Sequence, residues 1–189
     1  MPAPSITRQV VAALNQAGIS HMLVGAFARN YYAEPRSTKD ADLVLRIAAG
    51  SLRSVMDVLG PGFRLEEQMT FETNTGTLKN VIYHPESGFT VELFYLSDDA
   101  HDQERYQRRR ATVYEGLPTF VLTAEDYIVT KLRWPRTKDY DDVRDVVAMQ
   151  ASELDWAYIR QWADRHGSRA KLDRVVASIP PRPGRIIPA

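Results

Sequence analysis

The sequence predicts an α+β protein, in which a domain built on a mixed sheet is followed by a C-terminal helical subdomain. Before residue 122, short apolar runs typical of strands alternate with segments of helical periodicity. After that residue, every periodic segment has helical spacing. We therefore expect a core over residues 1–122, a helical subdomain over residues 123–180 and an extended tail over residues 181–189.

The first elements follow from periodicity and from the residues that bound them. Apolar residues recur at helical spacing after a cap at Ser5, and Gly18 ends that helix. Gly25 begins a turn into a short helix, and Ser51 can cap another. In order, we expect a helix over residues 5–17, a strand over 21–24, a helix over 25–32, a strand over 40–47 and a helix over 51–59.

The later elements extend the sheet and then give way to helices. Turn sequences containing Asn, Gly and Pro separate three strand candidates, which suggests an antiparallel extension. Thr123 with Asp126 resembles a capping box and begins the helical subdomain. The expected strands cover residues 63–73, 78–84, 89–96 and 120–122, and the expected helices cover residues 98–110, 124–134, 138–149, 155–166 and 169–179.

The composition limits the chemistry. The 24 basic residues balance 24 acidic ones among 189, so no overall field attracts nucleic acid. The chain has no Cys, which excludes disulfides and thiolate ligands and leaves carboxylates and four His for any metal. The sequence has neither a signal-peptide pattern nor an apolar run of about 18 residues, so we expect a cytoplasmic protein without membrane contact.

Two acids open the strand expected at residues 40–47. Asp40 and Asp42 share one face of it, because alternate side chains of a strand point the same way. Aspartate is disfavoured in strands and costly to bury unpaired, so the pair needs water, cations or a metal nearby. From this pair alone, a solvated strand end and a metal site are equally good explanations.

Glu92 lies in the run at residues 89–96, which is apolar on both faces as expected for a central strand. A lone acid there needs a partner, and an ion pair with Arg or Lys is the simplest structural one. Gathered with Asp40 and Asp42, it would instead suit Mg²⁺ or Mn²⁺, which prefer oxygen ligands. Nucleotidyl transfer would follow, with two ions about 4 Å apart activating a hydroxyl and stabilising the leaving pyrophosphate.

A turn at Gly25 precedes these acids. Gly25 and the small residue Ala26 stand where a strand turns into a helix, so backbone N–H groups can approach a phosphate. A glycine turn of this kind is common and by itself is usually only a turn. The turn becomes evidence for a phosphate site because Asp40 and Asp42 follow it at a suitable distance in the sequence.

Together these motifs resemble the DNA polymerase β-type nucleotidyltransferase superfamily, whose signature pairs a Gly-Gly or Gly-Ser turn with two spaced acids and a later third acid. The sequence is most similar to the AbiEii-type branch, which includes toxins of toxin–antitoxin systems and has an Arg-x-Thr-x-Asp segment before the acids. The segments that carry the resemblance are LVGA at residues 23–26, RSTKD at 36–40, DADL at 40–43, Glu92, and the helical segments 125–132 and 136–142.

The resemblance implies a metal-dependent nucleotidyltransferase in which Asp40, Asp42 and Glu92 are the catalytic and metal-binding acids. The residues that it assigns to the nucleotide are Gly25, Ala26, Arg36, Thr38, Lys131 and Lys138. One departure concerns Ala26, which replaces the Ser or second Gly of many members and offers phosphate no hydroxyl. A catalytically weak, nucleotidyltransferase-like binding protein is therefore the alternative to an enzyme.

The basic residues allow two interpretations each. Lys131 and Lys138 would face the nucleotide or be solvated, and Arg36 would bind phosphate or clamp an acid. The densest basic run, which would contact an RNA backbone or form a solvated helix face, comprises Arg105, Arg108, Arg109 and Arg110. By resemblance alone, the acceptor is RNA or a tRNA end, with a cognate antitoxin as a further partner. The alternative acceptor is a small molecule such as an aminoglycoside.

Overall fold

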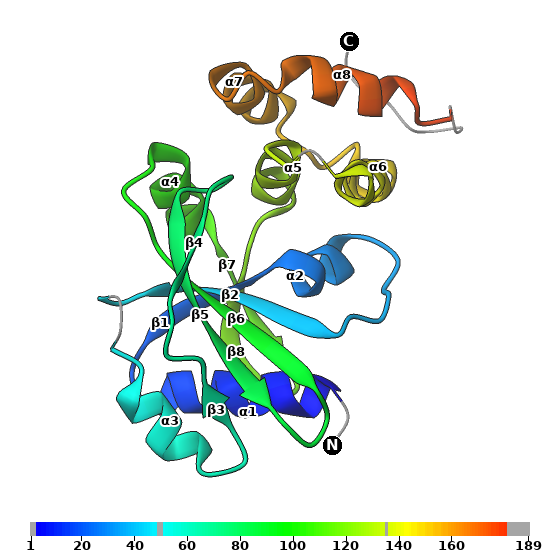
Figure 1. Ribbon diagram of the computed structural model, residues 1–189. Coiled ribbons are helices and arrows are strands. Elements are labelled where there is room, and N and C mark those ends of the chain that lie inside the picture. The colour runs from blue at the N-terminus through cyan, green and yellow to red at the C-terminus, as the bar shows by residue number, and fades with distance from the viewer. Residues whose placement is uncertain (1–2, 49–50, 135, 181–189) are drawn as a thin grey trace. The chain divides into compact units, whose positions relative to one another are not determined.

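The structure is a computed structural model that describes residues 3–48, 51–134 and 136–180, so the predicted tail at residues 181–189 lies outside the described residues. The described chain divides into two compact units. One unit holds the residues up to Phe27 together with 37–122, and the other holds 28–36 together with the described residues from Thr123 onward. Figure 1 labels the elements along the chain.

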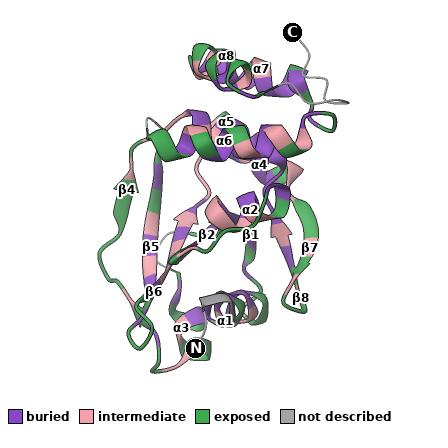
Figure 2. Cartoon of the chain, turned by 90° about the vertical axis from the view of Figure 1, so that its right-hand side faces the viewer, coloured by how far each residue is buried: buried purple, intermediate pink, exposed green. Residues whose placement is uncertain are grey.

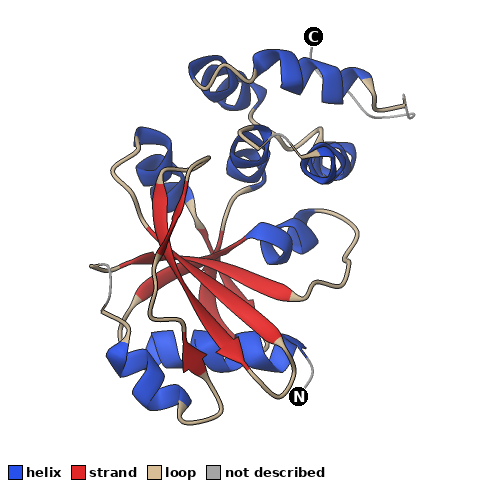
Figure 3. Cartoon of the chain, in the orientation of Figure 1, coloured by secondary structure: helices blue, strands red, loops and turns tan. Residues whose placement is uncertain are grey.

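The first unit is built on a mixed sheet (Figure 3). Its strands lie in the order β3-β5-β6-β2-β1-β8-β7, with β4 also paired to β5. Its strands are β1 Ser20–Val24, β2 Asp40–Arg46, β3 Arg64–Leu65, β4 Thr70–Glu72, β5 Thr77–His84, β6 Phe89–Tyr95, β7 Arg110–Tyr114 and β8 Leu117–Val121. Its helices are α1 Ala3–Gln16, α3 Arg53–Leu59 and α4 Ala100–Arg108, and α2 Gly25–Tyr32 begins in this unit and continues into the other.

The centre of the sheet is formed by β2, which runs parallel to β6 on one side and antiparallel to β1 on the other. Along β6, Val91 and Leu93 are fully buried, whereas Glu92 between them is half-buried. This alternation follows from the two-residue period of a strand. Figure 2 colours the elements of the chain by burial. Helix α1 packs against α3 and also contacts β1, β6 and β8. The α+β fold with a mixed sheet is thus confirmed.

Several details of the first unit differ from the expectation, among them the start of α1 at Ala3, before the expected cap Ser5, and strand β7, which was not expected. Helix α3 begins at Arg53, and its N-cap is Leu52, which makes no side-chain cap hydrogen bond, so Ser51 is not the cap. The strand expected over 63–73 is two short strands, β3 and β4, because both pair with β5 but at different places along it. The helix expected to reach Arg110 ends at Arg108, and strand β7 follows immediately.

The second unit is helical, as expected. Its helices after α2 are α5 Ala124–Leu132, α6 Thr137–Gln150, α7 Trp156–Arg165 and α8 Arg169–Ala177. The predicted cap is present: the Thr123 hydroxyl accepts the Asp126 N–H (3.1 Å) and donates to its Oδ2 (2.6 Å). Buried Asp126 also accepts a bond from the Tyr158 hydroxyl (2.5 Å), which ties α7 to α5. No helix among the described residues is long and apolar enough to span a membrane.

Candidate active site

The two strand acids and the third acid lie side by side on one face of the sheet. Asp40 and Asp42 alternate with buried Ala41 along β2, so both project from the same face. In the parallel pairing of β2 with β6, Asp42 is the register partner of Glu92. Asp40 is exposed, and the other two carboxylates are half-buried. The sheet register therefore makes Asp42 the centre of the acidic group.

Gly25 allows the Asp42 carboxylate to lie against the start of α2. Val24, the preceding residue, is the register partner of Asp42 across β1 and β2. Gly25 has φ +55°, and a Cβ added there would lie 1.8 Å from Asp42 Oδ2. Ala26, the next residue, is half-buried and brings no hydroxyl to this turn. The glycine is therefore required both by its backbone conformation and by the position of the acid.

Replacing Gly25 by alanine is expected to weaken Mn²⁺ binding by about tenfold or more, because the new methyl group displaces the Asp42 carboxylate. Gly18→Ala is the matched control. Gly18 has a similar φ of +66°, but no atom lies within 4 Å of an added Cβ. Titration of both variants with Mn²⁺ separates the clash from the backbone strain, and equal affinities would contradict the assignment.

Thr38 holds Asp40. Its hydroxyl lies 2.7 Å from Asp40 Oδ1 and 3.1 Å from the Asp40 carbonyl oxygen. A hydroxyl that donates to a carboxylate restricts the rotation of that side chain. In this structure, therefore, Thr38 positions a candidate metal ligand, and its expected contact with the nucleotide stays a prediction.

Glu92 has a cationic partner, Lys79, which was not among the predicted site residues. Lys79 on β5 places its Nζ 2.8 Å from Glu92 Oε1. Within the described part of the chain, the three acids do not make a group whose carboxylate oxygens all lie within 4.8 Å of one another. The contact with Lys79 is the ion pair that was left open as an alternative for Glu92. The signal in the sequence was a single Lys alternating with Val81 in the preceding strand.

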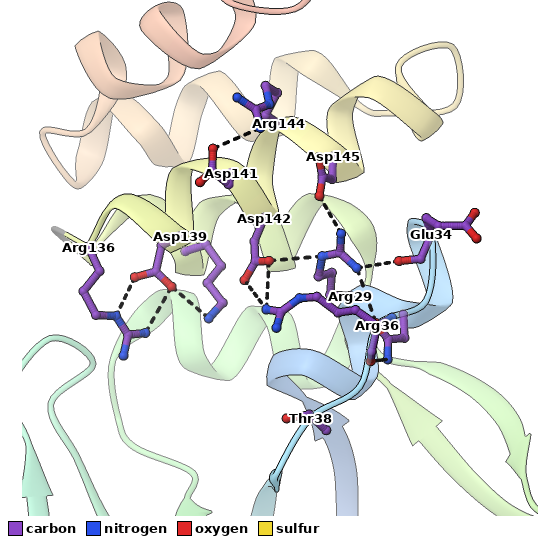
Figure 4. A network of polar contacts seen from close by, with 12 residues as sticks. Arg29, Glu34, Arg36, Thr38, Arg136, Asp139, Asp141, Asp142, Arg144 and Asp145 are labelled. Carbon is purple, nitrogen blue, oxygen red and sulfur yellow. Dashed lines mark hydrogen bonds and ion pairs between the residues drawn. The ribbon is translucent and has the colours of Figure 1, made fainter.

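In the helical unit, the candidate nucleotide-binding lysine is paired. Lys131 Nζ lies 3.1 Å from Asp139 Oδ1. Arg136 Nε lies 2.7 Å from the other oxygen of Asp139 (Figure 4). Burial alone would raise the pKa of Asp139, but hydrogen bonds and charges from Arg136 and Lys131 outweigh burial and lower the pKa below its usual value. Asp139 is thus held as a carboxylate. Lys138, by contrast, is exposed.

A second ion-pair network in the helical unit involves Arg36, the other candidate for the nucleotide. Arg36 Nη2 contacts both carboxylate oxygens of Asp142, at 2.9 and 3.0 Å. Arg29 on α2 is 3% exposed, and its Nε lies 3.1 Å from Asp142 (Figure 4). Arg36 therefore clamps an acid in this structure, and that acid is Asp142. Arg29 stands alone among non-basic residues in α2, so no sequence pattern marked it as part of this network.

The basic run does not form one solvated helix face. Arg105 is buried and paired with Asp102, and Arg109 lies over the rings of Tyr106 and Phe120, at 4.1 and 4.5 Å from their centroids. Arg108 is half-buried at the end of α4, and exposed Arg110 belongs to β7. Arg105 and Arg109 are thus committed to packing of the fold.

Solved structures with this arrangement of strands and helices are known. The antibiotic-resistance factor ANT(2'')-Ia matches with a TM-score of 0.62 at 16% identity, over 92% of this chain and 96% of that chain. A crystal structure of ANT(2'')-Ia in complex with adenylyl-2''-tobramycin matches with a TM-score of 0.58 at 15% identity, over 86% and 98%. An antigenic nucleotidyltransferase-like protein from Paracoccidioides brasiliensis matches with a TM-score of 0.54 at 14% identity, over 94% and 93%. The chain has a nucleotidyltransferase-like fold.

At sequence identities of 14–16%, the likeness to these structures shows the fold of this chain and nothing about its activity. No protein-family description matches the sequence, and no curated protein matches it. The predicted membership in the AbiEii-type branch is not shown by these comparisons and stays a prediction.

The acids on the sheet fit a divalent cation. Asp40 and Asp42 offer oxygen ligands only, which suits Mg²⁺ or Mn²⁺. Their exposed or half-buried positions leave room for a phosphate-bearing substrate to share the ion. The close approach of the Gly25 backbone to Asp42 places the start of α2 beside these acids.

Proposed function

We propose that this protein is a metal-dependent nucleotidyltransferase, which moves a nucleoside monophosphate from a nucleoside triphosphate to an acceptor hydroxyl. One observation carries the proposal: Asp42 lies beside Glu92 in the sheet register and directly against the Gly25 turn, with Asp40 on the same face. The nucleotidyltransferase-like fold supports it.

In the proposed reaction, the acceptor oxygen forms a bond to the α-phosphorus, and the bond from that phosphorus to the bridging oxygen breaks. Pyrophosphate leaves, and the hydroxyl proton passes to Glu92. Asp40 and Asp42 would hold the divalent cation, with Thr38 fixing Asp40. When bound, this cation supplies charge stabilisation for the phosphates. The free N–H groups at the start of α2 would face the phosphate chain.

The nature of the acceptor is part of the proposal. The resemblance to the AbiEii-type branch favours RNA and a toxin role. The packing of Arg105 and Arg109 into the fold removes half of the basic run expected to contact an RNA backbone. The match to ANT(2'')-Ia bound to adenylyl-2''-tobramycin favours a small molecule with a free hydroxyl, such as an aminoglycoside. Both acceptor classes therefore belong in one assay.

The test incubates the protein with each α-labelled nucleoside triphosphate and Mg²⁺ or Mn²⁺, in the presence of either total RNA or an aminoglycoside panel. We expect label on one acceptor class, loss of at least about 99% of transfer on chelation, and recovery when Mg²⁺ is restored. The same triphosphate labelled at the γ-phosphate should leave no label on the acceptor, since that phosphate departs with pyrophosphate.

Three other outcomes are informative. Transfer of the γ-label would replace nucleotidyl transfer with phosphoryl transfer. Binding of triphosphate without any transfer would favour the binding-protein alternative that Ala26 raises. If the protein bound neither metal nor triphosphate, the proposal would be lost.

A further inference from the structure

Lys79 lies on the same sheet face as the acids and is held there by two contacts. In the antiparallel pairing of β5 with β6, Lys79 is the register partner of Phe94, and Glu92 is that of Val81. The lysine therefore reaches Glu92 diagonally, at 2.8 Å, and its Nζ lies 5.3 Å from the centroid of the Phe94 ring. Its side chain is 19% exposed and that of Glu92 is 28% exposed. The pair is thus a largely enclosed part of the sheet face.

The other two acids have partners of their own. Thr38 bonds to Asp40, and the Asp42 carboxylate lies against the Gly25 backbone. Glu92 contacts a full positive charge, because Lys79 Nζ lies 2.8 Å from its Oε1. A divalent cation bound to Glu92 Oε1 would have to displace an ammonium group from direct contact, against the Coulomb energy of a partly buried pair.

We infer that Lys79 serves as the resident cation of Glu92, so that the site takes up one divalent cation, held by Asp40 and Asp42 without Glu92. This inference rests on the proposed function. Lys79 already matches the charge of Glu92, and one divalent cation matches the two charges of Asp40 and Asp42. The site would then differ from one in which two divalent cations share all three acids.

The pairing also changes what Glu92 can do. Its Oε1 is engaged by Lys79, which restricts the direction of the carboxylate and leaves its other oxygen to accept the proton in the proposed reaction. Lys79 would thereby be a positioning residue for Glu92. Its removal would release Glu92 as an additional metal ligand, because an unpaired carboxylate beside a metal site binds the cation.

The test measures Mn²⁺ binding to the full chain without nucleotide, by calorimetry and by electron paramagnetic resonance for stoichiometry. The wild-type protein should bind one Mn²⁺, and Asp40→Asn should lower the affinity for Mn²⁺ by about tenfold or more. Lys79→Met alone should bind Mn²⁺ about tenfold more tightly or take up a second ion. The decisive variant is Lys79→Met combined with Glu92→Gln, which keeps the net charge of the face and should bind Mn²⁺ within about threefold of wild type.

The double variant tests whether Glu92 is a metal ligand even where Lys79→Met alone fails to fold, since the double variant leaves neither Lys79 nor Glu92 as an unpaired charge. A loss of tenfold or more in the double variant would make Glu92 a metal ligand and overturn the inference. Two Mn²⁺ ions in the wild-type protein, or none, would overturn it as well. Because no nucleotide or acceptor is present, a negative transfer assay leaves these outcomes unaffected, so failure of the inference and failure of the proposed function remain distinct.

Discussion

Asp42→Asn is expected to lower nucleotidyl transfer by at least about 100-fold, on whichever acceptor carries the label. Asp42 is the one acid that adjoins both Glu92 in the sheet register and the Gly25 turn. Asparagine keeps the shape of the side chain and removes the negative charge that a divalent cation needs. The loss should therefore appear in the chemical step and in Mn²⁺ affinity together.

The matched control for this variant is Asp57→Asn. Asp57 is an exposed acid on α3 and has no part in the acidic group on the sheet. The control should transfer label at the wild-type rate and should unfold at the wild-type temperature. If Asp42→Asn also retained the wild-type rate, the carboxylates on β2 would not be the catalytic acids, and the proposed site would have to be abandoned.

Asp142→Asn is expected to destabilise the helical unit by about 3 kcal/mol. The side chains of Arg29 and Asp142 are 4% and 8% exposed, so removing the acid leaves a buried guanidinium with too little negative charge around it. Arg29 keeps Asp145 and the Glu34 carbonyl oxygen as partners, which places the expected loss at the lower end for a broken buried pair. Arg36 would lose its ion pair with Asp142 at the same time.

Unfolding of this unit can be followed separately, because all three tryptophans, Trp134, Trp156 and Trp162, belong to it. Urea unfolding monitored by tryptophan fluorescence should show the loss of stability. The control is Asp141→Asn, one residue away on α6, whose acid pairs with Arg144 in an exposed position. That variant should lose less than about 1 kcal/mol. Equal effects of the two substitutions would show that burial of the network does not determine its contribution.

Several elements of both units could be predicted from local patterns. Strand β2 has the predicted start at Asp40, α2 has the predicted bounds, and Thr123 caps α5 as its spacing with Asp126 indicated. These features depend on residues close in sequence, because strand alternation, glycine turns and helix caps are local interactions. By contrast, β7 was missed, since its residues are mostly exposed and lack the alternation of a buried strand.

The sequence by itself therefore determined that Asp40 and Asp42 share a strand face and that Gly25 precedes a helix. Only the tertiary structure decided which groups those residues meet. The register of β2 with β6 sets Asp42 beside Glu92, and the register of β5 with β6 brings Lys79 to the same acid. A shift of one residue in either register would reverse the faces, and registers are set by contacts between segments distant in the chain. For that physical reason, the acids could be named from sequence, but the cation already bound to one of them could not.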